Sequence, residues 1–176
     1  WMTRRALLRL STAASSSSNP AWTAQLTPTC SPRDVSFVLF GVLRMGDMFA
    51  DKGSFYEGHT REFVEDALAT AAKIAETEFM PHDRKADAHE PEFDAKTGGV
   101  KLIPEVGPAL AAFREAGFYG LHADNEFGGM QLPSAVTNAL LFPFYAANVS
   151  TSSFPFLTIA AGNMLRRAGS PAQLET

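Results

Sequence analysis

The sequence predicts an all-α fold: a helical bundle of five to six helices that follows a disordered N-terminal tail. Apolar residues recur at helical spacing in several separate segments after residue 31. Most of these segments begin at Ser, Thr or Pro and end at Gly or before Pro, the residues that favour helix ends. The one extended piece that we expect is brief, at Val100 to Ile103.

The first 31 residues have the composition of a transit peptide. The segment from Met2 to Cys30 is rich in Arg and Ser and contains no Asp or Glu. On a helical wheel three arginines fall on one side and two leucines on the other: Arg4, Arg5 and Arg9 against Leu7 and Leu10. We therefore expect a disordered mitochondrial targeting segment, and so the mitochondrial matrix. A disordered cytosolic tail and a plastid address are the alternatives.

Residues 32–80 are expected to form two helices. Ser31 can cap the first and Pro32 fits its first turn, while Gly46 is expected to end it. The second is expected to start at Thr60, to carry an apolar stripe rich in alanine, and to stop at Pro81.

The segment from His82 to Gly99 is polar, rich in turn residues and without a period, which predicts a long surface loop. A third helix is expected from Pro104 to about Ala116, where Gly117 ends it in the left-handed conformation.

Three further helices are expected in the C-terminal part. The fourth runs from Pro133 to roughly Asn148 and the fifth from about Phe154 to Ala168. The residues expected to face inward on the fifth helix are Leu157, Ala160, Ala161, Met164 and Leu165. Ser170 and Pro171 predict the start of a sixth helix, but the chain stops at Thr176. Because so short a helix is not stable on its own, we expect a truncated product or fragment.

Composition excludes several classes of function. The first 33 residues hold four arginines and no acidic residue, and the remaining 143 carry 11 basic and 19 acidic side chains. Such an acidic body repels phosphates, so we expect no nucleic-acid partner. No apolar stretch is long enough to predict a membrane span. The single cysteine, Cys30, allows neither an internal disulfide nor a thiolate metal cluster.

Other candidate sites are weak. The polar residues His82, Asp83, Asp87, His89 and Glu90 have metal-ligand types, but their spacing matches no ligand frame, so we expect a solvated loop and no metal site. His59 and His122 stand alone, and a capping or surface role is expected for them. No phosphate-binding loop and no nucleophile elbow occurs. Phe127-Gly128-Gly129 indicates a tight turn in which glycine is needed for positive φ or for close approach.

Three segments in order give the chain a family resemblance. The glycine loop, Gly117-Phe118-Tyr119-Gly120-Leu121 through Glu126-Phe127-Gly128-Gly129-Met130-Gln131-Leu132-Pro133, resembles the acyl-CoA dehydrogenase pattern "G-x-x-G-L … E-[YF]-G-G-x-G-L-[PS]". Gln131 departs from it, since a glycine is usual there. The two helices after this loop end in Arg167-Ala168-Gly169-Ser170-Pro171-Ala172-Gln173. This ending is similar to that of the corresponding pair of helices in the family. Arg33 to Phe40 and Pro81 to Asp94 resemble the methylmercaptopropionyl-CoA dehydrogenase-like branch with an N-terminal extension.

The resemblance implies that residues 32–176 are the N-terminal helical domain of a three-domain FAD-dependent enzyme, without the middle and C-terminal domains. Such enzymes convert an acyl-CoA to an enoyl-CoA: a glutamate removes the α-proton and a hydride passes to the flavin. The resemblance implies acyl-CoA as substrate, an electron-transferring flavoprotein as partner and a homo-oligomer at full length. The catalytic base and the flavin contacts are expected outside this chain, so the fragment should be inactive.

Within this chain the resemblance places one wall of the acyl slot at the start of the fifth helix, at Ser152, Ser153 and Phe156. Simple helix packing is the alternative role for these three residues. A non-catalytic helical interaction module or a pseudogene product is the alternative function. A family member used in the response to alkylation damage is a third, against which the acidic charge argues.

Overall fold

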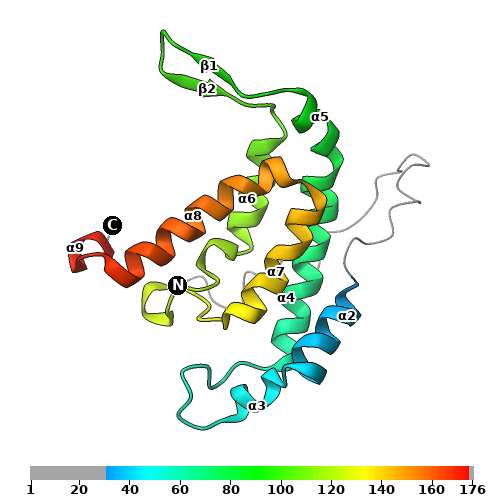
Figure 1. Ribbon diagram of the computed structural model, residues 1–176, viewed down its shortest axis with the longest axis vertical. Helices are drawn as coiled ribbons and strands as arrows, with labels where there is room; N and C mark the ends of the chain where they lie inside the picture. The colour runs from blue at the N-terminus through cyan, green and yellow to red at the C-terminus, as the bar shows by residue number, and fades with distance from the viewer. Residues whose placement is uncertain (1–30, 175–176) are drawn as a thin grey trace.

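The structure is a computed structural model that describes residues 31–174, and it confirms the all-α class (Figure 1). The α-helices are α2 (Pro32–Ser36), α3 (Met45–Ala50), α4 (Arg61–Ile74), α5 (Asp83–Ala88), α6 (Val106–Glu115), α7 (Ser134–Ala147), α8 (Val149–Ala168) and α9 (Pro171–Leu174). An antiparallel hairpin joins β1 (Glu92–Asp94) to β2 (Gly99–Lys101). The expected tail, apart from Ser31, lies outside the described residues.

The first helix begins as predicted but ends earlier. Ser31 caps α2, with the Asp34 amide 3.4 Å from its Oγ. A π-helical turn, Phe37–Val42, then continues the helix. The expected end at Gly46 is wrong, because Arg44 has a φ of 53° and breaks the helix two residues earlier. Gly46 instead lies inside α3, the next helix.

The second helix starts at the predicted cap, where the Thr60 side chain accepts a hydrogen bond of 3.1 Å from the Phe63 amide. The expected stop at Pro81 is wrong. After α4 the helix continues through a π-helical turn (Ala75–Phe79) and a 3-10 turn (Met80–His82) into α5. Pro81 falls in the first turn of the 3-10 segment, where its missing N–H removes no helical hydrogen bond.

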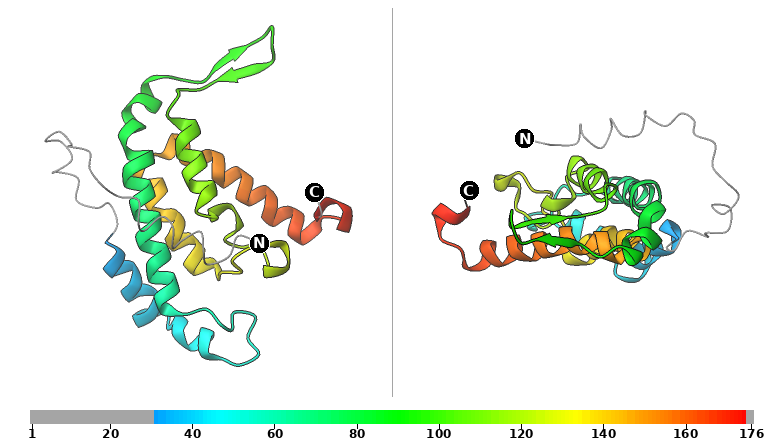
Figure 2. Two further views of the ribbon diagram at one scale, coloured as in Figure 1. Left: turned by 180° about the vertical axis from the view of Figure 1, so that it is seen from behind. Right: turned by 90° about the horizontal axis from the view of Figure 1, so that it is seen from above.

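The expected long surface loop at 82–99 is also wrong, since α5 and the hairpin occupy most of it. Phe93 lies opposite Val100 in the register, and the expected extended piece at Val100–Ile103 is confirmed in part as β2. Figure 1 and the left view of Figure 2 show the hairpin projecting away from the helices.

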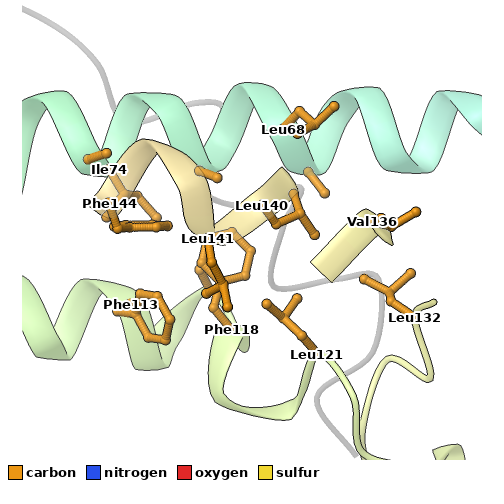
Figure 3. Packing of buried hydrophobic residues seen from close by; sticks show 14 of the residues in the cluster. Leu68, Ile74, Phe113, Phe118, Leu121, Leu132, Val136, Leu140, Leu141 and Phe144 are labelled. Atoms are coloured by element: carbon orange, nitrogen blue, oxygen red, sulfur yellow. The ribbon is translucent and has the colours of Figure 1, made fainter. Parts of the chain in front are cut away.

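The core lies between α4, α6 and α7, and a cluster of phenylalanine rings forms its centre (Figure 3). The Phe144 ring centroid lies 4.9 Å from that of Phe79, 4.9 Å from that of Phe113 and 5.8 Å from that of Phe118. All four rings are fully buried, and Phe144 meets the other three edge to face, an arrangement that aromatic pairs prefer. The alanines Ala67 and Ala71 let α4 approach this cluster closely.

The fifth predicted helix exists as α8, but it begins earlier and buries another face. Asn148 caps it by accepting a hydrogen bond of 2.9 Å from the Thr151 amide. Its buried residues are Thr151, Ser152, Pro155 and Ile159. The inward orientation expected for the apolar residues is wrong: Leu157, Ala160, Ala161 and Met164 are exposed, and Leu165 is half-buried. The later helix α9 starts at Pro171 as predicted, and the structure describes it as far as Leu174.

Across residues 31–174, none of the helices combines the length and the apolar character that crossing a bilayer requires.

Candidate functional site

The glycine loop, residues 117–133, folds back on itself. The Met130 amide donates to the Gly120 carbonyl (2.8 Å), and the Leu132 amide donates to the Leu121 carbonyl (2.9 Å). Gly128 has a φ of +78°, and a Cβ on Gly129 would stand 2.0 Å from the Ala123 carbonyl oxygen. The predicted need for glycine is therefore confirmed at both positions of the pair.

The two glycine motifs of the loop also touch one another. A Cβ placed on Gly120 would meet the Gly129 Cα at 3.4 Å, so the motifs form one packed turn. Several amides of this turn are used inside the loop, which leaves them unable to cradle a phosphate. These hydrogen bonds give the loop a structural role, and no cofactor contact is assigned to it.

Gln131, which replaces the family's usual glycine, adopts the left-handed backbone that glycine would favour, with a φ of 51°. Its side chain ties the loop to the segment before α4. Gln131 Nε2 donates to the Phe55 carbonyl (2.6 Å), and its Oε1 accepts from the Asn125 amide (3.1 Å). The Gln131 carbonyl oxygen lies 3.0 Å from His59 Nε2, which must donate because a carbonyl can only accept. His59 thus has a structural role.

The strain and the side-chain bonds at Gln131 act in opposite directions, which leads to a prediction. Gln131→Ala keeps the left-handed strain and loses both side-chain bonds, whereas Gln131→Gly loses the bonds but relieves the strain. We expect Gln131→Ala to be less stable than Gln131→Gly by about 1 kcal/mol. Urea unfolding followed by circular dichroism measures the difference, and equal midpoints would show that φ at this position carries no strain.

The three residues predicted to line the acyl slot point in different directions. Ser152 is fully buried, and its Oγ donates to the Phe144 carbonyl (2.7 Å). Ser153 is exposed, with its Oγ bonded to the Ser150 carbonyl (2.7 Å). Phe156 is half-buried, and its ring centroid lies 3.6 Å from that of Tyr145. Ser153 and Phe156 are therefore accessible to a ligand, whereas Ser152 supports the contact between α7 and α8.

A buried polar network anchors the first turn of α8. His82 Nε2 lies 2.8 Å from Thr151 Oγ1, and Asn148 Nδ2 donates to the Phe79 carbonyl (3.1 Å). His82 is only 3% exposed, and burial lowers the pKa of its ring despite the nearby carboxylates of Glu105 and Asp83. No pattern in the sequence indicates this network as a whole, although an asparagine at position 148, three residues before Thr151, is a recognised cap signal.

The candidate metal ligands do not converge. His82 faces Thr151, while His89 Nδ1 lies 3.0 Å from the Lys85 carbonyl oxygen. In the described part of the chain, no group of three His, Cys, Asp or Glu side chains is placed to hold a metal ion. His122 is half-buried, and its pKa is lowered by burial and by Arg166.

His82 gives a second prediction. Because its pKa in the folded protein lies below the unfolded value of about 6.5, the neutral ring contributes stability above that pH, and this stability is lost as the pH falls through the folded pKa. His82→Phe should remove this part of the pH dependence. At pH 7.5 it should cost about 2 kcal/mol, because the buried Thr151 hydroxyl loses its partner.

Urea unfolding at several pH values between 5 and 7.5 measures both effects. His122 contributes with the same sign and remains in the variant, so the two slopes are compared rather than tested against zero. His89→Ala, at an exposed position, is the control and should change stability by less than about 0.5 kcal/mol. An unchanged slope in His82→Phe would contradict the assignment.

The remaining feature of α8 is its uncovered apolar face. Leu157 is 73% exposed and Met164 63% exposed, and Ala160 and Ala161 lie between them on the same helix. From Phe154 to Met164 the helix carries no charged side chain. This face can offer an apolar surface to a ligand or to another part of a protein.

Comparison with known proteins supports the family resemblance that the glycine loop and the helices indicate. Residues 61–176 match the model of the acyl-CoA dehydrogenase N-terminal domain. Over 116 residues, 66% of this chain, the sequence is 33% identical to the broad-specificity linear acyl-CoA dehydrogenase FadE5 of Mycobacterium tuberculosis, and the match spans 19% of that relative. The resemblance of Arg33 to Phe40 and of Pro81 to Asp94 to one branch of the family stays a prediction. The chain belongs to the acyl-CoA dehydrogenase family and contains its N-terminal domain.

Proposed function

We propose that this chain is the N-terminal part of an FAD-dependent acyl-CoA dehydrogenase and that α8 supplies one wall of its acyl slot. The observation that carries the proposal is the exposed apolar face of α8 in a domain of this family. Ser153 and Phe156 lie at its N-terminal end, and the neighbouring Ser152 holds α8 against α7. Of the three residues predicted for the slot, Ser153 and Phe156 would thus contact the acyl chain, while Ser152 would hold the helix in place.

The reaction we propose for the whole protein is α,β-dehydrogenation of an acyl-CoA to an enoyl-CoA, with electrons leaving to an electron-transferring flavoprotein. When bound, FAD supplies the hydride acceptor. The apolar face of α8 excludes water from the acyl chain, but its stretch from Phe154 to Met164 holds no carboxylate to remove the α-proton. As the family resemblance implies, we propose that the base and the flavin contacts lie outside these 176 residues, that these residues alone are inactive, and that the full-length protein is a homo-oligomer.

The test is the visible spectrum of the protein expressed from its complete reading frame. We expect a flavin absorbance that bleaches when an acyl-CoA is added without oxygen, with enoyl-CoA formed in equal amount. A protein without flavin, or one whose flavin is not bleached by any acyl-CoA, would overturn the proposal and favour a non-catalytic helical module.

We also propose a location in the mitochondrial matrix, supported by the arginines and serines of the first 31 residues. Fusion of residues 2–31 to a fluorescent protein should direct it to mitochondria. Replacement of Arg4, Arg5 and Arg9 by alanine should leave it in the cytosol, and a wild-type fusion that stays in the cytosol would contradict the proposal.

A further inference from the structure

The first helix exposes one side on the flank of α4 that faces away from α6 and α8 (Figures 1 and 2). Along α2 and the π-helical turn that follows it, pairs of exposed residues alternate with pairs of buried or half-buried residues. The buried and half-buried pairs are Val35, Ser36, Leu39 and Phe40. The exposed residues form a surface that we call the α2 face: Arg33, Asp34, Phe37, Val38, Gly41, Val42, Leu43 and Arg44.

The centre of the α2 face is apolar. Phe37 is 67% exposed and Val42 61% exposed, and Val38 and Leu43 are exposed by about half. Grouped apolar side chains of this kind mark interaction surfaces. The helix lies outside residues 61–176, which match the family's domain, so the matched domain does not account for this face.

A groove runs beside the α2 face, between the first helix and α4. Its volume is about 490 Å³. Its lining combines apolar and charged residues of both helices: Phe37, Gly41 and Arg33 of the α2 face, and Leu68, Arg61 and Glu65 of α4. Arg61 and Glu65 already pair with each other (2.8 Å). The groove can therefore receive an apolar side chain of a second surface and, at Arg33, a carboxylate.

The charged residues near the two ends of the α2 face decide how a second copy would pair with it. Arg33 and Asp34 are exposed at the N-terminal end, and Arg44 and Asp47 at the C-terminal end. A parallel pair of helices would set each charge beside its own copy. An antiparallel pair sets Asp34 near Arg44 of the second copy and Arg33 near Asp47 of the second copy, and symmetry repeats both contacts.

The ion pair that Arg44 forms with Asp47 of its own chain (2.5 Å) does not prevent this arrangement. Both side chains are largely exposed, so the pair contributes little to stability. Arg44 therefore stays available to a carboxylate of a second copy.

The apolar residues fit the same antiparallel arrangement. With the two-fold axis between residues 39 and 40, Val38 lies opposite Gly41 of the second copy and Phe37 opposite Val42 of the second copy. The missing side chain at Gly41 leaves room for the valine. Residues 32–44 span only about 18 Å, which is short for a stable interface of roughly 1,200–2,000 Å². We therefore expect a weak dimer, with a dissociation constant in the micromolar range.

We propose that the α2 face pairs with the α2 face of a second copy of this chain, antiparallel and around a two-fold axis. The inference goes beyond the proposed dehydrogenase activity. It assigns one interface to the proposed homo-oligomer and requires neither flavin nor substrate.

The test is energy transfer between chains labelled at Cys30, the only cysteine in the sequence. Donor-labelled and acceptor-labelled wild-type chains should show transfer that saturates with concentration. Asp34→Arg and Arg44→Asp each set like charges opposite one another, so each variant alone should dimerise at least about tenfold more weakly. Asp34→Arg mixed with Arg44→Asp restores opposite charges at both ends, so this mixture should regain the wild-type dissociation constant within about threefold.

Two further variants sharpen the test. Val42→Asp puts a carboxylate into the apolar centre of the face and should abolish transfer. Asp87→Arg makes the same charge change as Asp34→Arg on α5, outside the face, and should dimerise like the wild type. All these positions are exposed, and circular dichroism checks that every variant is folded.

Three results would overturn the inference. A wild-type chain that stays monomeric would leave the α2 face to another segment, either residues 1–30 or a further domain of a longer protein. Single variants that dimerise like the wild type would place the contact elsewhere. Weak dimers in both single variants without recovery in the mixture would rule out the antiparallel pairing. None of these results affects the flavin spectrum, so the proposed function is tested separately.

Discussion

Replacing Gly129 by alanine is expected to destabilise the domain by about 3 kcal/mol, the upper end of what overpacking usually costs. The added Cβ would stand 2.0 Å from the Ala123 carbonyl oxygen and 2.3 Å from its carbon, and both are backbone atoms that no change of rotamer can move aside. Relief requires the loop to open, which would break the hydrogen bond between the Gln131 amide and the Ala123 carbonyl (2.9 Å). Urea unfolding of both proteins, followed by circular dichroism, measures the loss.

The matched control is Gly162→Ala. Gly162 lies within α8, is exposed and has no atom within 4 Å of an added Cβ. Alanine should stabilise the helix there by about 1 kcal/mol, so the two substitutions should have opposite signs. Equal midpoints for Gly129→Ala and the wild type would show that the loop is looser than described.

Replacing Phe144 by alanine is expected to cost about 4 kcal/mol. The Phe144 side chain is fully buried and meets the rings of Phe79, Phe113 and Phe118, which come from three other segments. Truncation removes contacts to all of them at once and leaves a cavity that none of the three can fill without moving its own helix or turn. The midpoint of urea unfolding should fall accordingly.

Phe142→Ala is the control on the same helix. Phe142 is 49% exposed, so its truncation should cost less than about 1 kcal/mol. A similar loss for both variants would mean that the ring cluster does not hold the bundle together.

Features fixed by local chemistry could be predicted from the sequence. Thr60 caps α4 because its hydroxyl is within reach of the Phe63 amide, and Gly117 ends α6 because it takes a φ of +77°. The glycine pair at 128–129 was predicted for the same reason. Each of these depends on a few adjacent residues, so no knowledge of the tertiary structure was needed.

Features fixed by packing could not be predicted in this way. The helix that begins with α4 continues past Pro81. The π-helical and 3-10 turns place this proline where the helix needs no backbone N–H as a hydrogen-bond donor. The hairpin is exposed on both faces, so it shows no alternation of apolar and polar residues. On α8 apolar residues occur on more than one side, and the side that packs against the other helices carries Thr151, Ser152, Pro155 and Ile159, which leaves Leu157 exposed.

The same was true of the candidate site. The resemblance to the family indicated Ser152, Ser153 and Phe156, but only the structure separates the buried Ser152 hydroxyl from the two accessible side chains. The tether from Gln131 to Phe55 spans 76 positions, and no local signal in the sequence reports such a contact.

The network around His82 has a consequence for how the protein opens. Its two long-range bonds, His82 with Thr151 and Asn148 with Phe79, each join residues 69 positions apart. The C-terminal end of the continuous helix that begins with α4, at residues 79–82, and the first turn of α8 therefore have to separate together rather than one after the other. In hydrogen exchange, the Thr151 and Ser152 amides should exchange only when the whole bundle unfolds. The amides of β1 and β2 should exchange through local openings of low free energy.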